Sequence, residues 1–174
     1  MAQANFISID SLKLVHDRRT VAGALAVADC ARLVESLHDS TGLLDYQLAG
    51  AVDRQERPLL QLRVGGVVQL QCQRCLEGFD HPLDIDTAVR LVAAEALESE
   101  YDDDPDEPDC VAASSEFDVT SLIEDEVLLA LPTYPRHEAG RCTGRTGSAE
   151  AAGAKILAFS ALQALKQKVI QSKE

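Results

Sequence analysis

Two cysteines stand two residues apart in the segment Cys72-Gln73-Arg74-Cys75, at the end of a run that alternates apolar and polar residues. Thiolates at this spacing on a tight turn can point both sulfurs at one centre, as the zinc ion of a zinc knuckle requires. An imidazole and a further thiol, His137 and Cys142, follow much later in the chain. These four side chains could close one tetrahedral zinc site, which would tie two remote segments together.

The same cysteines allow two other interpretations. They could be structural thiols without a metal, or a redox pair of the thioredoxin kind. The redox pair needs a CxxC motif at the N-terminus of a helix, where the helix dipole lowers the thiol pKa. Here a returning strand is expected after Cys75. His81 is an alternative nitrogen ligand, although a histidine beside a proline is more often a surface or hairpin residue.

Signatures of catalysis are missing from the sequence. It has no GxSxG elbow, no Walker glycine loop and no GxGxxG motif that opens a helix. The four histidines are scattered at positions 16, 38, 81 and 137, without an HExxH motif. We therefore expect no enzyme and no small-molecule substrate.

The composition favours one globular domain in a reducing compartment. The chain has 174 residues, of which 46% are hydrophobic, enough for one core. No apolar run is long enough to span a bilayer, and the N-terminus does not resemble a signal peptide. The five cysteines are an odd number, and thiols that stay reduced or bind metal fit the cytoplasm, our expected location.

The net charge of −13 is distributed unevenly. Residues 93–126 carry 14 acidic and no basic side chains, whereas residues 136–174 carry 7 basic and 3 acidic ones. Phosphate contacts depend on clustered Lys and Arg, so the acidic chain does not resemble an autonomous RNA-binding module. A basic protein partner, or contact of only the basic end with RNA, remains open.

The alternation of apolar residues predicts an antiparallel meander of four or more strands. We expect strands over residues 20–25, 44–52, 60–64, 68–70 and 79–89. A helix is expected over 27–37, ending near Gly42. Gly65-Gly66 is interpreted as a tight hairpin turn. The CxxC motif then lies at or near the tip of the next hairpin.

The second half of the chain predicts a mobile acidic loop followed by helices. The loop covers residues 98–116, rich in Asp, Glu and Pro. Asp118 is a good N-cap for a helix that Pro132 ends. The acidic residues Glu124, Asp125 and Glu126 are expected to face outward or flank the helix edges, as a solvated face or a docking surface for a basic partner.

The C-terminal residues predict one more amphipathic helix. Ile156, Phe159, Leu162, Leu165 and Val169 form an apolar stripe, which packs on the core or meets a partner. Basic residues near this region are candidate contacts to ribosomal RNA or to a partner. The candidates are Arg74, Arg136, Arg141, Arg145, Lys166 and Lys168.

Four segments together resemble the YceD family, the large ribosomal RNA subunit accumulation proteins. They are LQCQRC at 70–75, FDVTSLIEDEVLLALP at 117–132, Pro135-Arg136-His137 with Cys142, and FSALQALK at 159–166. The resemblance implies a role in the processing or accumulation of large-subunit ribosomal RNA, without an assigned reaction. Some relatives have more cysteines after the Pro-rich segment, where this chain offers only His137 and Cys142.

The combined interpretation is an α+β fold, an antiparallel meander or partly closed barrel packed by helices. Residues 1–135 form the core domain, and 136–174 form a basic segment with a helix. The function is that of a non-enzymatic ribosome biogenesis factor for 23S ribosomal RNA, with zinc as the candidate cofactor. The expected partners are a large-subunit precursor, ribosomal RNA or proteins, or another assembly factor, with no membrane. The alternatives are a zinc- or thiol-containing redox-responsive protein and an autonomous RNA-binding module.

Overall fold

The computed structural model describes residues 7–97 and 107–142. The chain divides after Cys142, and every described residue belongs to the first of the two units, Met1–Cys142. Within the described ranges, no helix is long and apolar enough to cross a membrane. The basic C-terminal segment from residue 143 onward, with its expected helix, lies outside the described residues.

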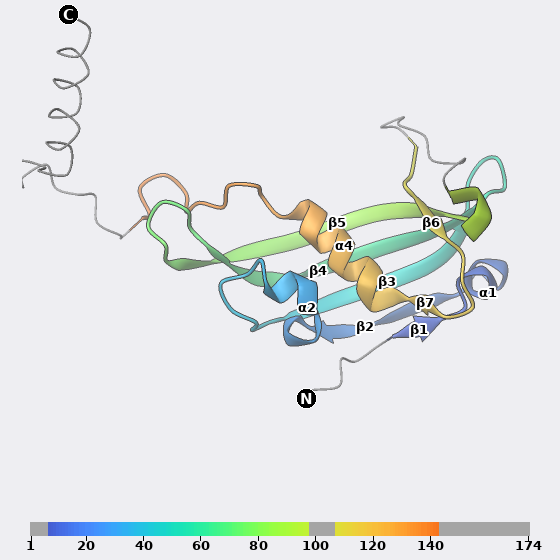
Figure 1. Ribbon diagram of the computed structural model, residues 1–174, viewed down its shortest axis with the longest axis horizontal. Coiled ribbons are helices and arrows are strands. Elements are labelled where there is room, and N and C mark those ends of the chain that lie inside the picture. The colour runs from blue at the N-terminus through green and yellow to red at the C-terminus, as the bar shows by residue number, and fades with distance from the viewer. Residues whose placement is uncertain (1–6, 98–106, 143–174) are drawn as a thin grey trace, which may run out of the picture. The chain divides into compact units, whose positions relative to one another are not determined.

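The fold is α+β and is organised around one open five-stranded sheet (Figure 1). The strand order is β2-β3-β4-β5-β6, and the first four strands form the expected antiparallel meander. Their bounds are Thr20–Ala26 for β2, Leu43–Val52 for β3, Pro58–Gln71 for β4 and Gly78–Val92 for β5. The two end strands of this sheet do not pair, so it is not a closed barrel.

The period of two along each strand divides the sheet into a buried and an exposed face. In β3, Leu44, Tyr46 and Leu48 are buried, whereas Asp45 and Gln47 between them are exposed. Successive side chains of a strand point to opposite faces, so the apolar positions all meet one core. The helix α4, Val119–Ala130, lies across that apolar face and contributes Val119, Ile123 and Val127 to the core (Figure 1).

The hairpin expected at Gly65-Gly66 is wrong, because β4 runs without interruption through both glycines. Neither glycine has a positive φ. A Cβ atom on Gly66 would lie 2.6 Å from the carbonyl oxygen of Leu43 on the neighbouring strand. Gly66 is therefore explained by the close approach of another backbone, and the residues on both sides of it belong to one long strand.

The helix expected over 27–37 is much shorter in the structure. A 3-10 turn, η1, covers Val27–Asp29, and α2 covers Ala31–Val34. Cys30 separates them with φ −95° and ψ 85°, which are not helical angles. Because α2 ends at Val34, the expectation that the helix ends near a left-handed cap at Gly42 is wrong; Gly42 has a φ of +123° and lies directly before β3.

Part of the expected acidic loop is ordered. Residues 98–106 lie outside the described part of the chain, but Cys110–Ala112 forms β6, which pairs in parallel with β5. A 3-10 turn, η2, covers Ala94–Ala96 at the end of β5. The loop prediction was therefore too long, because a three-residue strand is too short to carry a periodic signal.

The helix predicted after Asp118 is confirmed as α4, with the Asp118 carboxylate accepting a hydrogen bond from the Ser121 N–H at 3.0 Å. The N-terminal elements were not predicted. They are β1, Ser8–Ile9, and α1, Ser11–His16, and β1 pairs with β7, Phe117–Asp118. This two-stranded sheet fastens the beginning of the chain to the start of α4.

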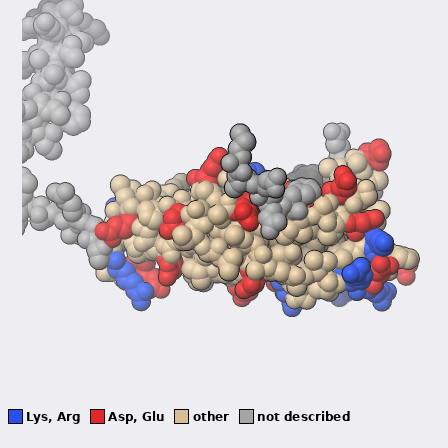
Figure 2. Space-filling view, turned by 90° about the horizontal axis from the view of Figure 1, so that it is seen from below, with Lys and Arg blue, Asp and Glu red and all other residues tan. Residues whose placement is uncertain are grey.

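Figure 2 shows acidic side chains in several separate places among mostly uncharged residues, with Lys and Arg mainly toward the two ends of this face. Acidic groups of this kind repel phosphate and attract basic protein segments.

Candidate metal centre

The β4–β5 hairpin carries the first two candidate ligands. Its turn spans Cys72 to Glu77, and the Cys72 N–H donates to the Glu77 carbonyl at 2.9 Å. The Leu76 N–H donates back to the Cys72 carbonyl at 2.8 Å, and Leu76 has a φ of +65°. This closed turn holds Cys72 and Cys75 in the knuckle arrangement that the spacing predicted.

The segment after α4 brings the other two ligands to the same turn. The Gln73 N–H donates to the Pro135 carbonyl at 3.0 Å, which fastens this segment to the hairpin. The rings of Phe79 and His137 lie with their centroids 5.0 Å apart at an angle of 44°. That contact orients the His137 imidazole over the start of β5.

The four predicted ligands form one cluster in the structure. Cys72, Cys75, His137 and Cys142 each offer a donor atom, and all four donors lie within 4.8 Å of one another. The Sγ atoms of Cys72 and Cys142 are 3.6 Å apart. The His137 Nδ1 lies 3.3 Å from the Sγ of Cys75 and 3.6 Å from that of Cys142.

These distances fit a tetrahedral zinc ion. Zinc bonds of about 2.3 Å to sulfur and about 2.0 Å to nitrogen, at tetrahedral angles, put two sulfurs about 3.8 Å apart and a sulfur about 3.5 Å from the nitrogen. A Cys₃His set is also a recognised structural zinc donor set, with soft thiolates suited to the ion. Four protein donors fill the coordination sphere, so the site would be a closed structural centre.

The electrostatics of the cluster favour thiolate ligands. Burial raises the pKa of Cys72. Hydrogen bonds from the backbone N–H groups of Cys75, His137 and Arg74 outweigh this effect and lower the pKa to about 5. The Arg74 Nε donates to the Cys142 Sγ at 3.1 Å, and this contact raises the pKa of the guanidinium. A cation beside the sulfurs would offset part of the negative charge of three thiolates.

Cys75 shows the opposite shift. The Glu77 N–H lowers its pKa, but burial and the neighbouring Cys72 and Cys142 thiols raise it, and the net pKa lies above the ordinary value. Several thiolates in one place repel each other, so a bound cation would favour loss of the last proton. The cluster is therefore arranged to exchange protons for a metal ion.

The acidic candidates on α4 are not all at the surface. Glu124 is buried, and its carboxylate accepts hydrogen bonds from the backbone N–H of Arg32 at 2.9 Å and from the Arg32 Nε at 3.1 Å. Asp125 pairs with the same guanidinium at 2.5 Å. Glu126 is half-buried, and burial followed by Asp109 and Asp125 raises its pKa. The expectation that all three flank or face solvent is wrong for Glu124.

The basic candidates fall into two groups. Arg74 and Arg136 are exposed beside the cluster, and Arg141 is exposed but pairs with Glu138 at 3.2 Å. Arg145, Lys166 and Lys168 lie outside the described residues. His81, the alternative ligand, pairs with Val68 in the β4–β5 register and is not a member of the four-residue cluster.

Sequence reasoning missed the contacts that support the site. It did not foresee that Arg74 contacts Cys142, that Phe79 contacts His137, or that Arg32 links α2 to α4. The position of Arg74 between the two cysteines was the only signal in the sequence for the first contact. The other two join positions that no local pattern relates.

Comparisons with known proteins give one consistent result. A family model described as "Large ribosomal RNA subunit accumulation protein YceD" matches residues 60–166, which include all four cluster residues. The large ribosomal RNA subunit accumulation protein YceD of Haemophilus influenzae is 30% identical over 138 residues, which cover 78% of this chain and 78% of that protein. No solved structure matches the chain.

Proposed function

The chain belongs to the YceD family of large ribosomal RNA subunit accumulation proteins, and from this premise we propose that it supports the processing or accumulation of 23S ribosomal RNA. It acts in ribosome biogenesis in the cytoplasm, as a binding factor and without a reaction of its own. The family membership supports the ribosomal role, and the closed geometry of the cysteine cluster supports the absence of chemistry there.

The observation that carries the proposal is the convergence of Cys72, Cys75, His137 and Cys142. Zinc held by these residues fixes the β4–β5 hairpin tip to the segment after α4. Closing a loop of about 70 residues removes conformational freedom from the unfolded chain, which stabilises the folded junction. The metal thus has a structural role, and the rigid junction is a surface that a large particle can engage.

The partner is a large-subunit precursor, through its ribosomal RNA, its proteins or another assembly factor. The exposed Arg74 and Arg136 beside the metal centre offer contacts to phosphate. The acidic remainder of the surface suits basic proteins instead. An autonomous RNA-binding module is disfavoured, because a net charge of −13 opposes binding to naked RNA.

Gradient profiling of ribosomal particles tests the proposal. Cells that lack the gene should accumulate fewer complete large subunits and less mature 23S ribosomal RNA, and the protein should co-sediment with large-subunit precursors. The wild-type gene and the Cys110→Ser variant should restore the profile, whereas Cys72→Ser should not. Cys110 is the matched control because its thiol lies outside the metal cluster. Unchanged large subunits in the deletion strain would refute the proposed function.

A redox-responsive role is the second candidate, and the low pKa of Cys72 with its proximity to the Cys142 thiol favours it. In that role a peroxide takes two electrons from the two thiols, which form a disulfide, and is reduced to water. The two functions make different predictions. The redox role requires that peroxide links Cys72 to Cys142 in the purified metal-loaded protein, whereas bound zinc protects both thiolates in the structural role.

A further inference from the structure

Among the described residues, one edge of the five-stranded sheet has none of the features that normally prevent another strand from pairing with it. The edge strand β2 spans seven residues, Thr20–Ala26, and contains no charged residue and no proline. Natural proteins usually protect an edge with Lys, Pro, a bulge or a very short strand, because free backbone groups are a template for a further strand. At the opposite edge, β6 has only three residues, and Pro108-Asp109 precede it.

The pairing register shows which backbone groups of β2 face this edge. Gly50 N–H donates to the Arg19 carbonyl at 2.9 Å and Val27 N–H donates to the Gly42 carbonyl at 3.1 Å, at the two ends of the β2–β3 register. Hydrogen-bonded pairs alternate along an antiparallel ladder, so the odd-numbered residues of β2 bond to β3. The N–H and C=O groups of Ala22 and Ala24 therefore point away from β3. Within the described part of the chain, no backbone group pairs with them.

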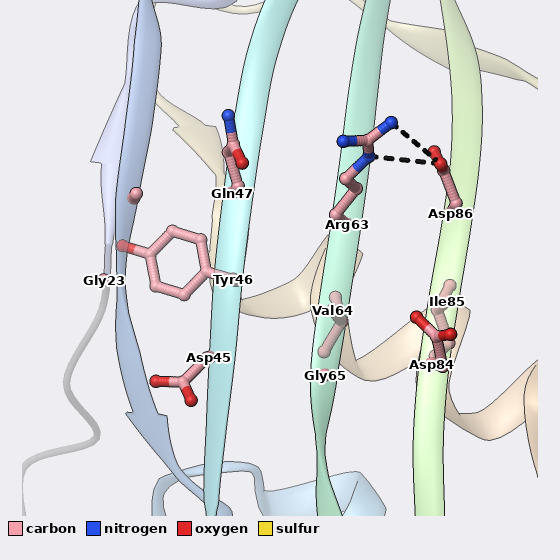
Figure 3. A pocket seen from close by; sticks show the side chains of 11 residues that line it. Gly23, Asp45, Tyr46, Gln47, Arg63, Val64, Gly65, Asp84, Ile85 and Asp86 are labelled. Carbon is pink, nitrogen blue, oxygen red and sulfur yellow. Dashed lines mark hydrogen bonds and ion pairs between the residues drawn. The ribbon is translucent and has the colours of Figure 1, made fainter.

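The exposed face of the sheet beside this edge is a shallow trough of about 560 Å³ (Figure 3). Its floor is low because Gly65 has no side chain, and Asp45 and Asp84 flank Gly65 in the same row. Asp86 is neutralised by Arg63 at 3.1 Å. Among the described residues, no hydrogen bond or ion pair to the Asp45 carboxylate is found, and in Figure 3 this carboxylate leans toward β2. An unpaired carboxylate thus lies one strand away from an unprotected edge.

We propose that β2 takes an extended segment of a basic protein as a sixth strand of this sheet. The segment pairs with the outward backbone groups of Ala22 and Ala24, and a Lys or Arg opposite Ala24 reaches across its methyl group to Asp45. Neighbouring strands lie about 4.8 Å apart, so the new strand and β3, on opposite sides of β2, are about 10 Å apart. The basic side chain and the Asp45 side chain together cover this distance. The small side chain of Ala24 leaves the path to Asp45 open, and a larger side chain at this position would block it.

Charge selects this occupant over two others. A second copy of the chain would bring together two molecules that each carry a net charge of −13. A nucleic acid has no peptide groups for the ladder, and its phosphates would be repelled by Asp45. The Asp45 carboxylate attracts a cationic segment at the Ala24 end of β2, whereas Arg18 and Arg19, which precede the other end, repel it. The basic residue of the partner therefore lies near Ala24. The proposed function bears only on the choice of a basic protein as the partner, and the pairing of a strand with β2 does not depend on it.

Amide hydrogen exchange, measured by NMR on the full-length protein, tests the pairing. The probe is an eight-residue peptide of alternating valine and lysine, and the control is the same peptide with glutamate in place of lysine. The lysine peptide should slow exchange of the Ala22 and Ala24 amides, and the glutamate peptide should not. Methylation of those peptide nitrogens that face β2 should abolish the effect, because it removes the donors of the ladder. Methylation of the alternate nitrogens should leave the effect in place.

Substitutions at the edge test the charge argument, with the amide spectrum of each variant as the check on folding. Asp45→Asn should weaken binding of the lysine peptide about threefold at low salt, the range of a single exposed ion pair. Ala24→Lys should weaken binding by charge repulsion, whereas Ala24→Glu, of similar bulk, should strengthen it, because its own carboxylate would pair with the lysine in place of Asp45. These measurements use purified protein and are independent of the ribosomal phenotype. Peptide binding can fail while the deletion strain shows the phenotype, and peptide binding can succeed while the deletion strain is normal.

Four results would overturn the proposal. The Ala22 and Ala24 amides could already be protected in the free protein, which would mean that another part of the chain or a second copy occupies the edge. The lysine peptide could fail to bind at millimolar concentration. It could bind without protecting these two amides. Finally, the lysine and glutamate peptides could bind equally, which would exclude a role for Asp45.

Discussion

The Sγ of Cys72 lies 3.6 Å from the Sγ of Cys142, although 70 residues separate the two cysteines. The distance is far longer than the roughly 2.05 Å of a disulfide and close to the separation of two sulfurs on one zinc ion. The hairpin tip and the segment after α4 are thus placed for a shared metal.

The purified protein should contain about one zinc ion per chain, as measured by elemental analysis of protein isolated without added metal. Cys72→Ser and Cys142→Ser should lose the ion, because serine is a poor ligand in place of a thiolate. Cys110→Ser should retain it, since its thiol is not in the cluster. A stoichiometric ion that survives both of the first two substitutions would refute the ligand set.

His137→Ala should weaken zinc binding more than about 100-fold, because it removes a direct ligand and the loss of an outer partner alone costs about 10- to 100-fold. His137→Cys is the matched variant, since it restores a fourth donor at the same backbone position, and should retain most of the affinity. Competition with a chromophoric chelator gives both values. Equal affinity of the alanine variant and the wild type would show that the imidazole is not a ligand.

Glu124→Ala should lower the free energy of unfolding by about 1–3 kcal/mol, because the carboxylate is buried and its loss leaves the Arg32 backbone N–H at the start of α2 without its acceptor, although the guanidinium keeps Asp125 and Ser121. Asp125→Ala is the control in the same network. Its side chain is 51% exposed, so the variant should lose less than about 1 kcal/mol. Urea unfolding compares the two, and equal losses would contradict the role given to Glu124.

Stability should fall as the pH rises above about 9, and Cys30 should account for part of the fall. Burial, followed by the charges of Glu124 and Asp29, raises the pKa of Cys30 from 9.0 to about 11. Between these values the unfolded chain loses the proton and the folded chain keeps it, so unfolding becomes more favourable with rising pH. The loss is on the order of 1–2 kcal/mol by pH 11. Cys30→Ala should show a smaller decline between pH 9 and pH 11 in urea unfolding; an identical slope would contradict this assignment.

Cys30 should be unreactive in the folded protein. Cys30 is fully buried and neutral at pH 8, so it should react with iodoacetamide only after unfolding. Mass spectrometry after labelling in the presence and absence of urea measures this. Rapid labelling of Cys30 in the folded protein would show that α2 opens readily.

The sequence determined the elements whose signal is local. Period-two alternation predicted the positions of β3 and β5, because a half-buried strand repeats that pattern wherever it lies. Asp118 marked the start of α4 through its side chain, and the CxxC spacing placed two sulfurs on one turn. The resemblance of several separated segments also sufficed to identify the family.

Other features depended on contacts between distant residues, and these only the tertiary structure decided. Gly65-Gly66 has the composition of a turn, yet the approach of the Leu43 backbone makes Gly66 part of a strand. Glu124 belongs by sequence to a solvated acidic run, but Arg32 draws it into a buried network. The sequence named His137 and Cys142 as the other two ligands, but only the tertiary structure shows how they reach Cys72 and Cys75, through the docking of Pro135 on Gln73. Local propensity carries no information about such partners, because their separation along the chain far exceeds the range over which neighbouring side chains interact.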